Sequence, residues 1–214
     1  MKIYNILIVD DHPMMRTAIR FVIEDQPGLK VAGEAGSIKE GRQAALAFRP
    51  DLILLDLYLP DGSGMDMIRF RNEQLPKVKI LVLTSSNNEQ DITDAVKAGA
   101  DGYVVKDSPP EQLILAVRSI LAGRAFLTPV ATNILLKQLR ADGVKPQDND
   151  LQLSDRELEI MKILARGATN SVIAEELKIA ESTVRSHFQR IQKKLGFTNH
   201  NQTLIYAVQN YTKG

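Results

Sequence analysis

The 214-residue sequence contains no cysteine and no long hydrophobic run. The absence of cysteine excludes disulfide bonds, zinc–thiolate sites and thiol catalysis. No apolar run approaches the roughly 18 consecutive residues that a membrane-spanning helix needs. The N-terminus also lacks the shape of a signal peptide. Since 44% of the residues are hydrophobic, the chain can bury a core, and we expect a cytoplasmic protein with no membrane contact.

A strong net charge is also absent, because the formal net charge is only +1. The charges are nevertheless unevenly distributed. Residues 1–126 hold 15 Lys and Arg against 17 Asp and Glu, whereas residues 151–214 hold 9 against 6. The segment 183–194 contains four basic residues and no acidic one. This asymmetry indicates that the second part contacts a polyanion, and the alternative is an ordinary solvated helix face.

Short apolar runs alternate with helical patterns in the first half of the chain. Strands are expected near 4–9, 30–35, 52–56, 78–84 and 102–105, with helices near 13–25, 38–48, 64–74, 89–98 and 110–122. Such runs are typical of buried parallel strands. The short connections imply right-handed crossovers, so this half predicts a five-stranded, doubly wound parallel sheet.

The second half predicts helices only. A helix is expected over 127–139, followed by a flexible linker over 140–150. Residues 151–214 contain about four helical patterns, of which the first opens with the capping box Ser154–Glu157. A short helix, a tight turn and a longer basic helix over 182–195 form a helix-turn-helix pattern. We therefore predict an α/β domain over 1–126, a linker over 127–150 and an all-α domain over 151–214.

Polar residues follow the ends of four predicted strands: Asp10 and Asp11, Asp56, Thr84 and Lys106. The carboxyl ends of parallel strands meet at one edge of a sheet, where ligands bind. Adjacent carboxylates repel each other without a cation, and Mg²⁺ prefers such oxygen ligands. Asp56 would then act as a nucleophile toward a phosphoryl group, contacted by Lys106 and Thr84. The alternative for each single Asp is a helix N-cap.

The segments ILIVDDHP, DLILLDLYLPDGSG, LVLTSS and GADGYVVKD occur in this order. Together they resemble the receiver domain of two-component response regulators, which has a flavodoxin-like fold. The C-terminal segment LSDRELEIMKILARGATNSVIAEELKIAESTVRSHFQRIQKKLG resembles the LuxR-type helix-turn-helix. The combination resembles the NarL/FixJ family, and the receiver segments are most similar to NarL-like members.

The resemblance implies that Asp56 accepts a phosphoryl group from a sensor histidine kinase. It also implies roles for the residues around Asp56: Asp10, Asp11, Asp56 and the backbone carbonyl of Tyr58 for Mg²⁺, Lys106 and Thr84 for the phosphoryl group, and Thr84 with Tyr103 for a conformational switch. Without the resemblance, Tyr103 is interpreted as an ordinary half-buried strand residue. Beyond phosphorylation and slow dephosphorylation of the receiver itself, we expect no enzymatic activity.

The predicted recognition helix carries the candidate DNA contacts. Its N-terminal part would read base edges in the major groove of double-stranded DNA. We expect base contacts from Arg185, Ser186 and Gln189, and phosphate contacts from Thr183, Arg190, Lys193 and Lys194. Phe188 is expected in the core, with contact to a thymine methyl group as the alternative. The sequence departs from the family at Ala180, where a serine cap is frequent, and at Ser171–Val172, where Lys–Glu is usual.

These features predict a transcription regulator that is activated by phosphorylation and then binds DNA as a homodimer. RNA polymerase is a possible further partner. The first alternative is the same architecture switched without phosphorylation, by a small ligand or an adaptor protein. A remote alternative is a phosphatase with an aspartyl nucleophile, although such enzymes usually carry a second acid where this chain has Tyr58.

Overall fold

The computed structural model describes residues 2–85, 88–124, 126–127, 131, 134, 153–197 and 200–211. Its contacts divide the chain into two units, Met1–Thr132 and Asn133–Gly214. The predicted helix over 127–139 and linker over 140–150 lie almost wholly outside the described residues. Within the described ranges, no helix is both long enough and apolar enough to cross a membrane.

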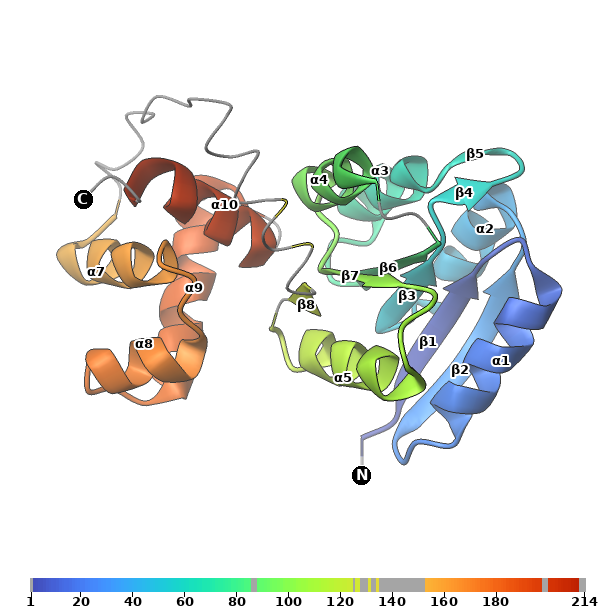
Figure 1. Ribbon diagram of the computed structural model, residues 1–214, viewed down its shortest axis with the longest axis horizontal. Helices are drawn as coiled ribbons and strands as arrows, with labels where there is room; N and C mark the ends of the chain where they lie inside the picture. The colour runs from blue at the N-terminus through green and yellow to red at the C-terminus, as the bar shows by residue number, and fades with distance from the viewer. Residues whose placement is uncertain are drawn as a thin grey trace. The chain divides into compact units, whose positions relative to one another are not determined.

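The first unit is built on a parallel sheet with the strand order β2-β1-β3-β6-β7-β8 (Figure 1). The strands are β1 (Tyr4–Val9), β2 (Leu29–Ala35), β3 (Leu52–Leu55), β6 (Lys79–Thr84), β7 (Gly102–Val105) and β8 (Phe126–Leu127). The five predicted strands and their doubly wound order are confirmed. The sixth strand, β8, is missing from the prediction because two residues are too few to show a periodicity.

Helices cover both faces of this sheet (Figure 1). Helices α1 (Pro13–Glu24) and α5 (Pro110–Leu121) cover one face, and α2 (Ile38–Phe48), α3 (Gly64–Gln74) and α4 (Glu89–Ala98) cover the other. Alternate strand residues such as Ile6, Ile8, Leu52 and Leu54 pack against α1 and α5. Since the intervening residues are buried against the opposite layer, the strands appear in the sequence as unbroken apolar runs.

A small antiparallel hairpin, β4 (Tyr58–Leu59) with β5 (Gly62–Ser63), follows β3 and was not predicted. The carboxylate of Asp61 in its turn accepts backbone hydrogen bonds from Ile38 (2.7 Å) and Lys39 (2.9 Å). Both bonds lower the pKa of Asp61, and the bond from Lys39 has the larger effect. Asp61 thereby caps helix α2 from a distant loop.

Glycine is required at position 64, where the hairpin meets α3. A Cβ atom at Gly64 would lie 2.5 Å from the carbonyl oxygen of Asp56 and 2.8 Å from the Cα of Leu57. Both neighbours are backbone atoms, so no side-chain rearrangement can relieve the clash. The close approach fixes the chain directly after Asp56.

A buried ionic cluster ties α3 to the start of β7. Arg71 is 1% exposed, and its guanidinium donates to the Gly99 carbonyl at 2.6 Å and to Asp101 at 3.4 Å. Burial lowers the pKa of Arg71, although the charge of Asp101 opposes this effect. Asp101 also accepts from the Lys79 ammonium (3.0 Å) and the Ile80 amide (2.9 Å). Asp101 is therefore satisfied from three sides despite its burial.

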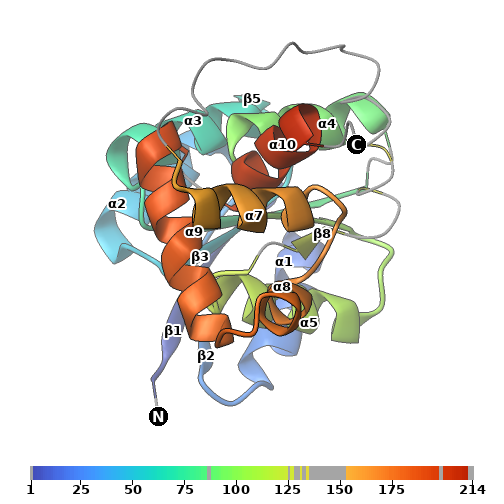
Figure 2. The ribbon, with the colours of Figure 1, turned by 90° about the vertical axis from the view of Figure 1, so that its left-hand side faces the viewer.

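The described part of the second unit consists of helices α7 (Asp155–Leu164), α8 (Asn170–Glu176), α9 (Glu181–Leu195) and α10 (His200–Tyr211) (Figure 2). This all-α architecture confirms the prediction. The helices share one core, which includes Ile160, Ile173, Val184 and Ala207. Phe188 is 3% exposed and belongs to this core, as expected.

The helix ends of the second unit follow the predicted signals. Ser154 and Glu157 form the capping box of α7, and Gly196 ends α9 in the left-handed conformation (φ 70°). Ala180 precedes α9 without a side-chain cap, so this helix lacks the stabilisation that a serine would give.

Glu157 also links α7 to the end of α9. It is 2% exposed, and its carboxylate accepts hydrogen bonds from the Lys194 ammonium (2.6 Å) and the Ser154 amide (2.8 Å). Burial alone would raise the pKa of Glu157, but the hydrogen bonds from Lys194 and Ser154 outweigh burial and lower it. The carboxylate therefore stays ionised inside the domain.

We predict that Glu157→Gln destabilises the second unit by about 2 kcal/mol at neutral pH, because hydrogen bonds to a charged group are lost. A carboxylate with a lowered pKa stabilises the fold above its ordinary value of 4.5 and stops doing so as the pH falls through the lowered pKa. The difference in the free energy of unfolding between wild type and variant should therefore disappear at acidic pH. Urea unfolding at several pH values, followed through NMR signals of Ile160 and Met161, measures it.

The matched control is Glu159→Gln, which removes an exposed carboxylate that pairs with Arg156 on the same helix. Such surface pairs contribute little, so this variant should unfold like wild type at every pH. A loss of stability at Glu157 that is independent of pH would contradict the assignment of an ionised, stabilising carboxylate.

Candidate functional site

Three carboxylates meet beyond the carboxyl ends of β1 and β3. Asp10 and Asp11 follow β1, Asp56 follows β3, and ligand atoms of these residues and of His12 all lie within 4.8 Å of one another. Asp10 is 2% exposed and Asp56 is 4% exposed. At this depth water screens their repulsion poorly, so the cluster requires positive charge.

Lys106 supplies part of that charge. Its ammonium lies 2.6 Å from Asp10 Oδ2 and 2.6 Å from Asp56 Oδ2. Burial alone would lower the pKa of Lys106, but its hydrogen bonds and attraction to Asp10 and Asp56 outweigh burial and raise it. The Lys106 amide also donates to the carbonyl of Thr84 at 2.8 Å. The ends of strands β6 and β7 therefore position a charged ammonium between two carboxylates.

Backbone amides orient the same two carboxylates. The His12 amide donates to Asp10 Oδ1 at 2.8 Å, and the Tyr58 amide donates to Asp56 Oδ1 at 3.3 Å. In each carboxylate, one oxygen thus accepts a backbone hydrogen bond from the loop that follows it, and the other oxygen contacts the Lys106 ammonium. This arrangement holds Asp56 at the centre of the predicted phosphorylation site.

The chemistry of the donor set fits Mg²⁺. The Asp11 carboxylate is one-third exposed, and its buried Oδ1 atom lies 2.5 Å from the His12 imidazole without satisfying hydrogen-bond geometry. An incompletely bonded carboxylate oxygen beside two further carboxylates is the kind of ligand that a hard divalent cation takes, together with several waters. Asp10, Asp11 and Asp56 are the residues that would hold it.

Thr84 and Tyr103, the predicted switch pair, lie on the neighbouring strands β6 and β7. Both side chains are fully buried. Tyr103 pairs with Val82, two residues before Thr84 on β6. Burial raises the pKa of Tyr103 above its ordinary value, and the charge of Asp91 adds to the effect. The phenol therefore remains protonated.

Several residues at the site were missed by the sequence reasoning. Arg16 on α1 donates to the Asp10 carbonyl at 2.6 Å and to Glu34 at 3.3 Å. A second cation therefore binds the backbone of the loop that carries the acidic pair. No sequence signal marks Arg16 or Asp91. His12 could have been found, because it directly follows the acidic pair.

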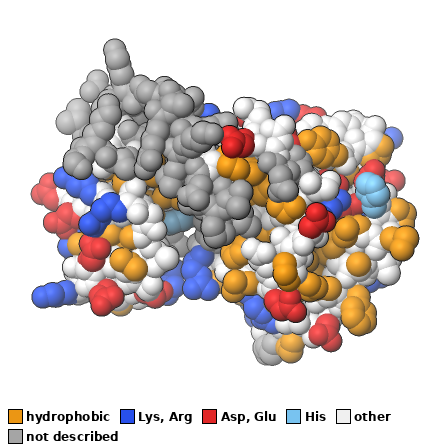
Figure 3. Space-filling view, viewed as in Figure 1, with side chains coloured by type: hydrophobic (Ala, Val, Ile, Leu, Met, Phe, Trp, Pro, Cys, Tyr) orange, Lys and Arg blue, Asp and Glu red, His pale blue; other side chains and the backbone are white. Residues whose placement is uncertain are grey.

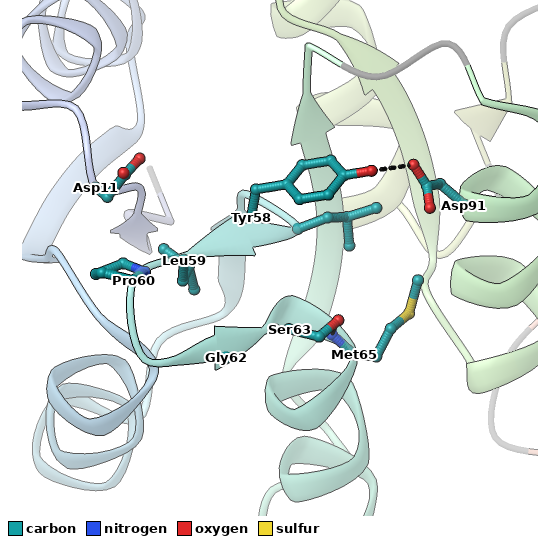
Figure 4. A pocket seen from close by; sticks show the side chains of 9 residues that line it. Asp11, Tyr58, Leu59, Pro60, Gly62, Ser63, Met65 and Asp91 are labelled. Atoms are coloured by element: carbon teal, nitrogen blue, oxygen red, sulfur yellow. Dashed lines mark hydrogen bonds between the residues drawn. The ribbon is translucent and has the colours of Figure 1, made fainter.

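A cavity of about 430 Å³ adjoins the acidic pocket. Its lining includes Asp11, Tyr58, Met65 and Asp91, which come from the end of β1, the β4–β5 hairpin, α3 and α4 (Figure 4). The Tyr58 hydroxyl crosses to α4 and donates to Asp91 Oδ2 at 2.5 Å. Tyr58 therefore lines the cavity beside the acidic pocket and is bonded to α4.

The predicted DNA-contact residues all lie on the exposed side of α9: Thr183, Arg185, Ser186, Gln189, Arg190, Lys193 and Lys194. The opposite side carries Val184, Phe188 and Ile191, which are buried. The Arg185 guanidinium lies 3.6 Å from Glu181 in an exposed ion pair, which holds it only weakly.

Lys194 differs from the other basic residues of α9. Its ammonium is bonded to the buried Glu157, which favours a structural role over the predicted phosphate contact. Figure 3 shows Lys and Arg side chains interspersed with acidic ones on the visible face of the second unit. On this face no patch of positive charge singles out a binding surface, and the exposed row on α9 is the more specific feature.

Comparison with known proteins assigns both parts of the chain. The response regulator receiver domain matches residues 6–118, and the bacterial regulatory proteins of the luxR family match residues 151–207. The nitrate/nitrite response regulator protein NarL of Escherichia coli (strain K12) is 37% identical over 205 residues, which cover 96% of this chain and 95% of NarL. The DNA-binding transcriptional activator DevR/DosR of Mycobacterium tuberculosis (strain H37Rv) is also 37% identical over 205 residues, covering 96% of this chain and 94% of that protein.

The crystal structure of the response regulator ChrA of a heme-sensing two-component system is 30% identical in sequence, covers 98% of both chains and has a TM-score of 0.54. These similarities extend over the receiver sheet and the helical domain alike. The chain therefore belongs to the two-component response regulators that join a receiver domain to a LuxR-type DNA-binding domain, and NarL is among its relatives.

Proposed function

We propose that phosphoryl transfer to Asp56 switches this response regulator, and that the phosphorylated form binds specific DNA as a homodimer to regulate transcription. The observation that carries the proposal is the pocket in which Lys106 lies 2.6 Å from both Asp10 and Asp56. A buried carboxylate next to two other carboxylates and one ammonium suits the capture of an electrophilic phosphoryl group.

In the transfer step, an Asp56 oxygen attacks phosphorus while the bond between phosphorus and the kinase histidine breaks. The histidine leaves as a free imidazole, and Asp56 becomes an acyl phosphate. Asp10, Asp11, Asp56 and the Tyr58 carbonyl would hold Mg²⁺, which would supply positive charge to neutralise the phosphoryl oxygens. Lys106 exchanges its contact with the Asp56 carboxylate for one with a phosphoryl oxygen.

The switch follows from the position of Thr84 at the end of β6. The acyl phosphate adds charge and strong acceptors, toward which the Thr84 hydroxyl is drawn. Space next to Thr84 then becomes available to Tyr103 on the adjacent strand β7. This local change biases the packing of α4, β7 and α5, which is a two-state mechanism of signalling.

The output is binding to double-stranded DNA through α9. The exposed row that includes Arg185, Gln189 and Lys193 supports this role, as does the similarity to a relative that is named as DNA-binding. A two-fold dimer would place two recognition helices on paired half-sites. In this proposal Arg185 and Gln189 contact bases, whereas Lys193 contacts a phosphate.

Homodimer formation is supported by large apolar side chains on the receiver surface. Phe21 on α1 is 76% exposed and Leu115 on α5 is 58% exposed. Figure 3 shows hydrophobic side chains grouped on the side of the receiver where these two helices lie. Such groups favour association, because burial between two copies removes them from water.

Acetyl phosphate with Mg²⁺ should add one phosphoryl group to the wild-type chain and none to Asp56→Ala, as measured by intact-mass spectrometry. The same treatment should strengthen specific DNA binding by about tenfold or more in wild type only, a coupling of about 1.4 kcal/mol. Equal DNA binding by treated wild type and Asp56→Ala would contradict the proposal and favour a regulator switched by a ligand or an adaptor.

Two substitutions on α9 should have different effects on DNA binding. Arg185→Ala should relax the base preference at one position, at a cost of about 1–3 kcal/mol. Lys193→Ala should weaken binding to all sequences and lower the slope of log affinity against log salt concentration by about 1. Fluorescence anisotropy at several salt concentrations measures both, and identical effects of the two variants would contradict the assignment.

A further inference from the structure

The hydrogen bond between Tyr58 and Asp91 joins the loop after the phosphoacceptor to helix α4 (Figure 4). The Tyr58 hydroxyl donates to Asp91 Oδ2 at 2.5 Å, although the two residues are 33 positions apart. The amide of the same Tyr58 donates to Asp56 Oδ1 at 3.3 Å. Residue 58 therefore contacts the phosphoacceptor with its backbone and α4 with its side chain.

This bond anchors the ring of Tyr58 to helix α4. The residue is 54% exposed, and an exposed side chain without an anchor exchanges freely among its rotamers. A hydrogen bond to an ionised carboxylate is stronger than one between neutral groups. Asp91 lies in the first turn of α4, where the helix also stabilises its negative charge.

The anchored ring lines the cavity that adjoins the acidic pocket. Asp11 and Asp91 lie on different sides of this cavity, and Figure 4 shows the Tyr58 ring reaching from β4 toward Asp91. Because Asp11 belongs to both the cavity and the carboxylate cluster, the cavity borders the cluster that contains Asp56.

We propose that water reaches Asp56 through this cavity, and that Asp91 is a positioning residue that holds the Tyr58 ring there and thereby prolongs the lifetime of the acyl phosphate on Asp56. The inference rests on the proposed phosphorylation of Asp56. In the reaction that limits the lifetime, a water oxygen attacks phosphorus and the bond between phosphorus and Asp56 breaks. The products are inorganic phosphate and the free carboxylate, and an anchored ring restricts the approach of that water.

The test compares the half-life of the phosphorylated full chain, after removal of acetyl phosphate, among Tyr58→Phe, Asp91→Ala and the double variant. Tyr58→Phe retains the ring and removes only the hydroxyl. Each single variant should shorten the half-life by about fivefold, as expected for one lost hydrogen bond. The double variant should be no faster, because both changes remove the same interaction.

Asp94→Ala is the matched control, since Asp94 is an exposed carboxylate on the same helix that accepts a hydrogen bond from Gln90 within α4. Its half-life should equal that of wild type. Wild-type half-lives for both Tyr58→Phe and Asp91→Ala, or additive effects in the double variant, would overturn the inference.

A wild-type chain that accepts no phosphoryl group would refute the proposed function instead. The role of the Tyr58–Asp91 hydrogen bond is then tested on the unphosphorylated chain by NMR relaxation of the Tyr58 ring. Asp91→Ala should increase the mobility of this ring whereas Asp94→Ala should not, and an unchanged ring in Asp91→Ala would overturn the assignment of Asp91.

Discussion

Repulsion among three carboxylates is the constraint on which the rest of the site depends. A parallel sheet brings the ends of β1 and β3 to one edge, and the sequence places Asp10, Asp11 and Asp56 there. Poor screening makes the cluster unfavourable unless cations accompany it. Lys106 provides one such cation, and the oxygen donors leave a place suited to a second. The fold thus builds a pocket whose charges suit the metal ion and the phosphoryl group of the proposed function.

The same pocket is connected to the parts of the receiver that would change on phosphorylation. Lys106 is bonded through its amide to the strand that carries Thr84, and Tyr58 connects Asp56 to α4. A change of charge at Asp56 therefore reaches two elements through direct bonds. The DNA-binding domain has its own core and its own ionic link, Glu157 with Lys194, so its recognition helix is formed independently of the receiver core.

Much of this architecture could be predicted from the sequence because it depends on local patterns. Unbroken apolar runs predicted the five main strands, and capping residues such as Ser154 and Gly196 predicted helix ends. The contacts that could not be predicted join residues far apart in the chain. Examples are the hydrogen bond between Asp61 and the start of α2 and the hydrogen bond between Tyr58 and Asp91. The partners in these bonds follow from tertiary packing rather than from spacing in the sequence.

The basic helix illustrates a subtler limit of sequence reasoning. Lys193 and Lys194 are neighbours of the same type, yet only Lys194 is bonded to a buried carboxylate. The 37-residue separation between Lys194 and Glu157 hides this difference from any local pattern. A charge count alone therefore overstates the number of side chains that are available to DNA.

The most direct test of this account is calorimetric titration of the unphosphorylated full chain with Mg²⁺. If clustered carboxylates create the site, wild type should bind one ion, and Asp11→Asn should bind it at least about tenfold more weakly because a charged ligand is lost. Absence of binding to wild type, or equal binding by both proteins, would contradict the account.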